Sequence, residues 1–117
     1  MVYSVKERDL MNILCFGDSN TWGYRPDRKG RFDENIRWTG LLQKRLSPDC
    51  HIIEEGLCGR TTIFQDELRE NRRGLDMIGV TVEMHNPLDL VIIMLGTNDC
   101  KNRYGASASV IAKGLDQ

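Results

Sequence analysis

Three short apolar segments, each closed by glycine, constrain the fold of this 117-residue chain more than any other feature of its sequence. The segments are NILCFG (12–17), HIIEEG (51–56) and LDLVIIMLG (88–96). Runs of this length that are rich in Ile, Val and Leu predict β-strands, and their continuous apolarity predicts burial on both faces. The chain therefore carries the pattern of one buried sheet.

The segments between these strands carry a helical pattern. Apolar residues at spacings of three and four predict one helix in each gap, through Trp38, Leu41, Leu42 and Leu46 and then through Leu75, Ile78 and Val82. This alternation predicts an α/β fold with a parallel sheet, right-handed crossovers and helices on both faces. Residues 104–117 start like another helix, with Ser107 or Ser109 as its N-cap.

Composition excludes several classes of function. With 28% charged residues and a net charge of −1, the chain offers no electrostatic basis for capturing nucleic acid or an anionic membrane. Its longest apolar run, LDLVIIMLG, is far shorter than the roughly 20 residues that a membrane span needs, and MVYSVKERDL contains no apolar signal region. We therefore expect a cytoplasmic protein that binds neither nucleic acid nor membranes.

The cysteines and histidines indicate neither a disulfide framework nor a metal site. Four cysteines without a C-x-x-C pair favour reduced, buried thiols: Cys15, Cys50, Cys58 and Cys100. His51 and His85 are isolated from each other and from the cysteines, so no zinc-ligand spacing exists. Neither G-x-x-x-x-G-K-[ST] nor G-x-G-x-x-G occurs. We therefore expect no metal and no cofactor.

Chemistry-bearing residues follow each predicted strand. In GDSNTWGY (17–24), a tight turn would present the hydroxyl and the backbone N–H of Ser19 at the start of a helix. In EEGLCGRTT, Gly56 and Gly59 can bring backbone N–H groups close to a ligand. In GTNDC, Asn98 can direct its amide N–H into the same cleft.

Each feature alone is also typical of a purely structural role. Asp18 or Ser19 can cap a helix, the second motif can be a simple turn, and Asn98 can form an Asx-turn. Together they are more specific, because an acyl-transfer site needs a nucleophile and several donors aimed at a developing oxyanion. In a parallel sheet the three strand ends meet at one edge. The joint pattern favours a serine esterase.

Through FGDSNTWGY, IIEEGLCGRTT and LVIIMLGTNDC the sequence resembles the SGNH (GDSL-type) hydrolases, especially their arylesterase and acyltransferase branch. The resemblance runs from Met11 to about Ser107. It implies a flavodoxin-like three-layer sandwich with strand order 2-1-3-4-5, and ester hydrolysis through an acyl-enzyme with water or an alcohol as acceptor. It also implies site roles: Ser19 as nucleophile, an oxyanion hole formed by the N–H groups of Ser19 and Gly59 and the amide of Asn98, and motif-supporting positions at Gly17, Asp18, Gly96 and Asp99.

One part of that family pattern has no counterpart here. The Asp-x-x-His block that supplies the base and its carboxylate partner does not occur in the sequence. Because doubly wound domains of this kind have on the order of 200 residues, we expect the chain to be an N-terminal part, truncated after the third of about five strands. His51 and His85 should lie at the opposite edge of the sheet from Ser19, so neither is expected to be the base. The isolated chain should be nearly inactive.

The remaining expectations concern domains, substrate and partners. Residues 1–10 are interpreted as an N-terminal extension, with Met11 as an alternative start, and residues 11–117 as the hydrolase portion. The charged segments 25–34 and 66–74 are interpreted as solvated loops or as a lid. Trp22 and Phe64 are candidates to line an apolar pocket for a small acyl ester. The open edge of the third strand predicts a homo-oligomer or association with the missing C-terminal segment.

A different class of function stays open at this stage. The alternative is a non-catalytic, flavodoxin-like binding or assembly module, a truncated or degenerate hydrolase that holds a small anion at the Gly17–Thr21 turn. A cysteine hydrolase is less attractive, because Cys15 lies inside a predicted strand.

Overall fold

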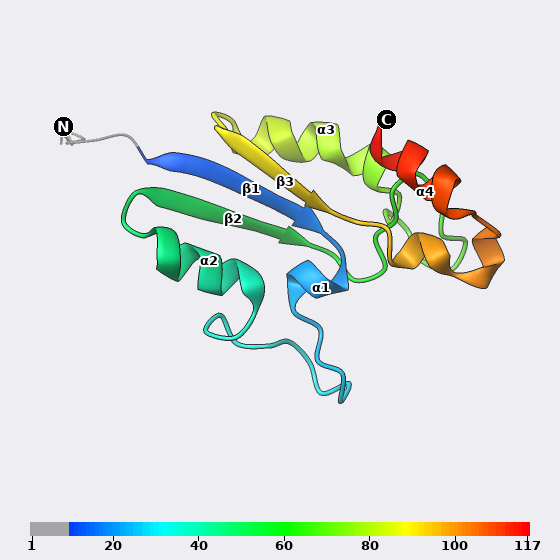
Figure 1. The fold of residues 1–117 in the computed structure, drawn as a ribbon, viewed down its shortest axis with the longest axis horizontal. Helices are drawn as coiled ribbons and strands as arrows, with labels where there is room; N and C mark the ends of the chain where they lie inside the picture. Colours follow the sequence, from blue (N-terminus) through cyan, green and yellow to red (C-terminus); the bar gives the residue numbers. More distant parts are fainter. Residues whose placement is uncertain (1–9) are drawn as a thin grey trace.

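The computed structural model describes residues 10–117 and shows an α/β fold built on one parallel sheet (Figure 1). The strands are β1 (Met11–Gly17), β2 (Cys50–Gly56) and β3 (Leu90–Met94), in the order β2-β1-β3. The register pairs Gly17 with both Gly56 and Met94. All three strands therefore end at the same edge of the sheet, and the predicted parallel α/β fold is confirmed.

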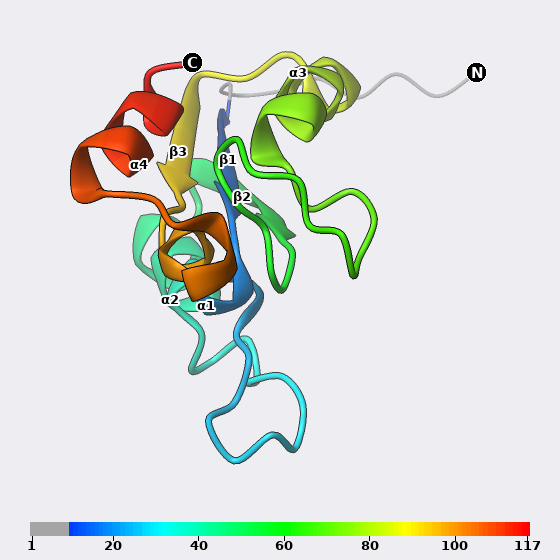
Figure 2. The ribbon, with the colours of Figure 1, turned by 90° about the vertical axis from the view of Figure 1, so that its right-hand side faces the viewer.

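Helices cover both faces of the sheet, which makes three layers (Figures 1 and 2). The four-residue α1 (Ser19–Trp22) and α2 (Trp38–Leu46) pack on β2, while α3 (Gly74–His85) covers the other face. Beyond β3 follow the 3-10 turns η1 (Asn98–Cys100) and η2 (Asn102–Tyr104) and then α4 (Ala108–Leu115). Ser107 is the N-cap of α4, because its hydroxyl accepts the Val110 N–H at 3.3 Å.

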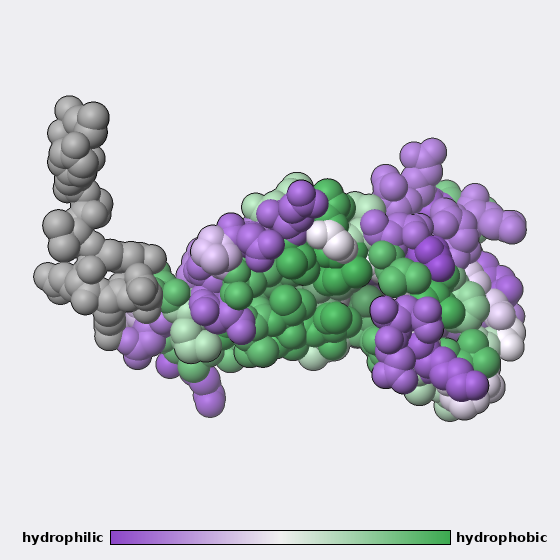
Figure 3. Space-filling view, turned by 90° about the horizontal axis from the view of Figure 1, so that it is seen from above, coloured by the Kyte–Doolittle hydropathy of each residue, from purple (hydrophilic) through white to green (hydrophobic). Residues whose placement is uncertain are grey.

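The core lies along β1, the central strand. Its residues Ile13 to Phe16 are at most 4% exposed, as continuous apolarity predicts. The same expectation is wrong for β3, where Leu90, Ile93 and Met94 are 44–47% exposed. Because Ile93 and Met94 point to opposite faces of the sheet, the helices within residues 10–117 leave part of both faces of this edge strand uncovered. Figure 3, a view from above Figure 1, shows apolar side chains gathered between the more polar ends of the molecule.

The two edges of the sheet differ in how their backbone groups are satisfied. On the outer edge of β2, the Gln43 side chain donates to the Cys50 carbonyl and accepts the Ile52 N–H, both at 2.8 Å. This amide replaces part of a neighbouring strand. Among residues 10–117 no side chain does the same for β3. An apolar, uncapped edge favours pairing with another polypeptide.

Two further expectations concern the N-terminal extension and the charged segment 25–34. Residues 1–9 lie outside the described part of the chain, so the proposed extension and the alternative start at Met11 stay predictions. Residues 25–34 form a loop that projects away from the sheet (Figure 1).

None of the helices in the described range is long and apolar enough to cross a membrane.

Candidate active site

Ser19 is the first residue of α1, directly after β1. The helix is capped by Asp18, whose Oδ1 accepts the Asn20 N–H at 2.9 Å. Asp18 is 1% exposed, and this burial raises the pKa of its carboxyl above its ordinary value. Because Asp18 performs the capping, the half-buried Ser19 hydroxyl has no capping task, and it makes no hydrogen bond to any residue in the described range.

Two glycines allow α1 to lie against the strand ends. A Cβ on Gly56 would be 2.2 Å from the backbone N of Trp22, and one on Gly17 would be 2.1 Å from Oγ1 of Thr21. Real Cβ atoms essentially never approach another heavy atom more closely than 3.0 Å. The position of Ser19 therefore depends on the absence of side chains at both strand ends.

The loop after β2 is hydrogen-bonded to the C-terminal end of β1. The Leu57 N–H donates to the Gly17 carbonyl at 3.1 Å, and the chain then turns through Gly59, whose φ is +86°. Glycine adopts this left-handed conformation without strain. Gly59 is buried, and the guanidinium of Arg69 lies against it.

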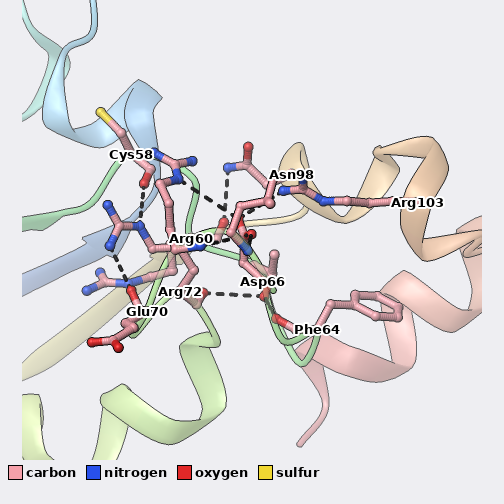
Figure 4. Close-up of polar contacts among 11 residues, drawn as sticks. Cys58, Arg60, Phe64, Asp66, Glu70, Arg72, Asn98 and Arg103 are labelled. Atoms are coloured by element: carbon pink, nitrogen blue, oxygen red, sulfur yellow. Dashed lines mark hydrogen bonds and ion pairs between the residues drawn. The ribbon is translucent and has the colours of Figure 1, made fainter.

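The loop after β3 is joined to the loop after β2 by two side chains. Asn98, in η1, donates from Nδ2 to the Arg60 carbonyl at 3.0 Å. Asp99 is fully buried and accepts both the N–H of Thr62, at 2.9 Å, and the Thr62 hydroxyl. Figure 4 shows Asn98 directed at Arg60. Asn98 is thus hydrogen-bonded to the residue that follows Gly59, although Asn98 and Gly59 are 39 positions apart in the sequence.

Arg60 lies among these candidate site loops, and sequence reasoning did not single it out. It is 4% exposed, and one nitrogen, Nη1, donates to the carbonyls of Glu55 at 2.7 Å and Gly17 at 3.1 Å. Its guanidinium carbon lies 3.9 Å from the centroid of the Phe16 ring. Burial lowers the pKa of the guanidinium to about 10. The sequence offered one signal, the position of Arg60 directly after Gly59. Because arginine is seldom buried, that position alone did not predict a buried side chain.

The segment 66–74, expected to be a solvated loop or a lid, is held in place by hydrogen bonds to its neighbours. Arg72 donates to the Cys58 carbonyl at 3.0 Å, and buried Asp66 accepts Arg103 at 2.9 Å (Figure 4). These contacts hold the segment next to Gly59. The segment is therefore anchored to the loop after β2 and is not a freely solvated loop.

The two histidines lie elsewhere. His51 is exposed and pairs in register with Asn12, near the start of the sheet. His85 is the last residue of α3, and its Nε2 is 3.0 Å from Oε1 of Glu55. Neither histidine contacts Ser19 within the described part of the chain. The structure thus brings no imidazole to the serine.

The two candidate pocket aromatics are not brought together. Trp22 lies beside Tyr24, with ring centroids 6.5 Å apart, whereas Phe64 stacks on Tyr104 at 4.9 Å. A cavity of about 420 Å³ lies between α2 and β2, and one of about 250 Å³ lies beside Arg103 and Tyr104. Neither cavity is lined by Ser19, Trp22 or Phe64.

No group of His, Cys, Asp or Glu within residues 10–117 could hold a metal ion. All four cysteines are free, and burial raises the pKa of the Cys15 thiol to about 11. A thiol of that pKa is a poor nucleophile at neutral pH. What the arrangement offers chemically is a serine hydroxyl and nearby N–H donors.

Comparison with known proteins gives a consistent answer. The chain matches the GDSL-like lipase/acylhydrolase family over residues 15–117. It resembles the inhibitor-bound aryl esterase of M. smegmatis with 44% identity and a TM-score of 0.87, covering 91% of this chain and 51% of that one. A carbohydrate acetylesterase family member from Sinorhizobium meliloti gives 42% identity and 0.87, covering 92% and 51%.

No curated protein matches the chain. The chain spans about half the length of the two solved structures, in agreement with the expectation that it corresponds to an N-terminal part. The family match includes the motifs around Ser19, Gly59 and Asn98 and extends over nearly all the described residues. The chain belongs to the GDSL-like lipase/acylhydrolase family.

Proposed function

We propose that this protein is a serine esterase that cleaves small acyl esters through an acyl-enzyme on Ser19. The observation that carries the proposal is the convergence of three motif segments on Arg60: its side chain binds Gly17, beside the serine turn, and its carbonyl accepts Asn98. The similarity to an aryl esterase and to a carbohydrate acetylesterase supports the same class of substrate.

In this proposal the Ser19 hydroxyl gives its proton to the base and attacks the ester carbonyl, and the tetrahedral intermediate then breaks its bond to the alcohol, which takes up the proton and leaves the acyl group on Ser19. The N–H groups of Ser19 and Gly59 and the Asn98 amide hold the oxyanion of this intermediate. Asn98 has two amide protons and gives one to Arg60, so one remains for the substrate. Deacylation by water completes hydrolysis, and deacylation by an alcohol would be acyl transfer. A preorganised donor of this kind is worth about 10²–10³ in kcat.

The base and its carboxylate partner come from outside the 117 residues. Neither His51 nor His85 contacts Ser19 among the described residues. Loss of the base from a serine triad costs on the order of 10⁶ in kcat and leaves ~10³–10⁴ over water. The isolated chain should therefore be nearly inactive, and the base must come from a further segment or a partner.

The test is hydrolysis of 4-nitrophenyl acetate by the protein as its gene encodes it. Ser19→Ala should abolish turnover, and under excess substrate the intact wild-type protein should gain the mass of a single acyl group that Ser19→Ala does not gain. Ser109→Ala is the matched control, because Ser109 is exposed on α4 and should be replaceable without effect.

The outcomes separate the esterase from the non-catalytic module. Turnover that depends on Ser19 and not on Ser109 supports the esterase. Background rates in the wild type that Ser19→Ala leaves unchanged contradict it and favour the binding or assembly module. The same assay on the 117-residue chain alone should give rates near background.

A further inference from the structure

Arg60 contacts each of the three segments that carry the candidate chemistry. Its Nη1 binds the Gly17 carbonyl, two residues before Ser19, and the Glu55 carbonyl near the end of β2. Its own carbonyl accepts the Asn98 amide, and its peptide N follows Gly59 directly. No other described residue has hydrogen bonds to the ends of β1 and β2 and to the loop after β3.

The burial of this arginine is costly for a purely structural contact. A guanidinium that is 4% exposed has lost most of its hydration, and no carboxylate forms a salt bridge with it within the described range. Its Nε is buried without a hydrogen-bond partner. The Phe16 ring, 3.9 Å away, offsets part of this cost through a cation–π contact. The charges of Glu55 and Asp18 act in the same direction, and that of Arg72 opposes them.

A guanidinium suits this position because it is planar and carries five donors in a rigid arrangement. One of its nitrogens reaches two carbonyls that belong to neighbouring strands. A lysine ammonium is a single flexible point charge and fixes the relative position of two strand ends less well. The two side chains carry the same charge, so comparing them separates geometry from electrostatics.

We propose that Arg60 is a positioning residue of the site: it sets the distance between the Ser19 turn and the donors Gly59 and Asn98. This inference rests on the proposed esterase function. Arg60 would not touch the substrate, because its side chain is buried beneath the loops and directed at backbone carbonyls. Its effect is on the geometry of groups that do.

The test is Arg60→Lys in the protein as its gene encodes it, with Arg73→Lys as the matched control. Arg73 lies on the same loop system and donates to the Ile63 carbonyl at 2.6 Å, but has no contact with Gly17, Gly59 or Asn98. A displacement of about 1 Å at a catalytic group can cost ~10²-fold. At a temperature where both variants are fully folded, we expect kcat to fall about 10- to 100-fold in Arg60→Lys with KM little changed.

Hydrogen–deuterium exchange gives a readout that does not depend on activity. The segment 57–62, followed in a proteolytic peptide that begins before residue 56, includes the Leu57 N–H, which donates to the Gly17 carbonyl. It should exchange faster in Arg60→Lys and at the wild-type rate in Arg73→Lys. A loss of melting temperature alone, with kcat per folded molecule unchanged, would mean that Arg60 is merely structural and would overturn the inference.

The two measurements also separate this inference from the proposed function. If the wild type shows no hydrolysis that depends on Ser19, the proposed function fails, and exchange in the segment 57–62 alone decides whether Arg60 positions the loops. Unchanged exchange in Arg60→Lys overturns the inference in either case. Faster exchange together with lower kcat in Arg60→Lys only is the result that supports it.

Discussion

The Asn98 amide donates to the carbonyl of Arg60 at 3.0 Å and so ties the loop after β3 to the loop after β2. This hydrogen bond fixes one amide proton and with it the plane of the whole side chain. The second proton is then held in one direction without further cost at the moment of reaction. Preorganisation of this kind is what makes oxyanion donors effective.

Replacement of Asn98 should therefore reduce catalysis more than it reduces stability. In the protein as its gene encodes it, Asn98→Ala should lower kcat by about 10²–10³, or ~2.7–4 kcal/mol. Steady-state hydrolysis of an aryl acetate measures this. Asn98→Asp keeps the shape but has no N–H to donate, so it should be at least as impaired. Full activity in Asn98→Asp would show that the amide does not hold the oxyanion.

Gly56 should tolerate no side chain. Because an added Cβ would lie 2.2 Å from the backbone N of Trp22, Gly56→Ala must push α1 and Ser19 away from β2. We expect a loss of about 1–3 kcal/mol in the free energy of unfolding, measured with urea. The control is Gly79→Ala on α3, where nothing lies within 4 Å and alanine should add about 0.5–1 kcal/mol. Equal effects in both variants would contradict the packing argument.

The ion pair on the outer side of β2 should make stability depend on acid pH. Glu54 accepts Arg37 through both oxygens, at 2.6 and 3.0 Å, and Thr39 at 2.6 Å. The hydrogen bond from Arg37 is the main cause that lowers the pKa of Glu54 from 4.5 to about 2. Because the folded-state pKa is depressed, this stabilisation is fully present above pH 4.5 and is lost as pH falls toward 2.

With the pair partly exposed, the contribution should be on the order of 2 kcal/mol. Thermal unfolding measured between pH 5 and pH 2 should show a drop in the wild type that Glu54→Gln largely removes. Arg37→Met should remove the same part of the drop, since it deletes the partner. A wild-type pH dependence that survives in both variants would assign the effect to other carboxylates.

Asp99 and Thr62 should contribute to stability through a buried contact. Thr62→Val removes the hydroxyl that donates to the fully buried Asp99 carboxylate, and we expect a cost of about 1–3 kcal/mol. Thr81→Val is the control, because its equally buried hydroxyl donates to the Met77 carbonyl, which the helix already satisfies. Urea unfolding should show a much smaller change in the control. A larger change in Thr81→Val would mean that Asp99 does not depend on Thr62.

The uncapped edge of β3, together with its exposed apolar side chains, should cause self-association of the 117-residue chain. Ile93 is 47% exposed on an edge strand whose backbone groups no described side chain caps. Light scattering should show a mass that rises with concentration, and Ile93→Lys should reduce it. Ile36→Lys should not, because Ile36 is exposed on a loop away from the sheet. A monodisperse monomer at all concentrations would contradict the prediction.

Some of the site could be read from the sequence because the signals are local. A glycine-closed apolar run predicts where a strand ends, and GDS, Gly59 and Asn98 each stand directly behind or close to such an end. Parallel pairing then brings the ends to one edge, as the register of Gly17 with Gly56 and Met94 confirms. Whether Ser19, Gly59 and Asn98 have the proposed catalytic roles stays a prediction.

Other features depended on contacts between distant residues. Arg60 is an ordinary polar residue in its local sequence, and only the packed loops show that it is buried against Gly17 and Glu55. Trp22 and Phe64, both candidates to line a pocket, lie against different aromatic partners: the Trp22 ring is tilted against Tyr24, and Phe64 stacks on Tyr104.

The sequence by itself determined the α/β fold, the order of its elements and the residues that follow each strand, because apolar periodicity and glycine positions act over a few residues. Only the tertiary structure decided which side chains are buried, how Arg60 and Asn98 join the loops, and that the apolar strand β3 has an exposed side. Those outcomes depend on which distant segments come into contact, and no local pattern encodes that.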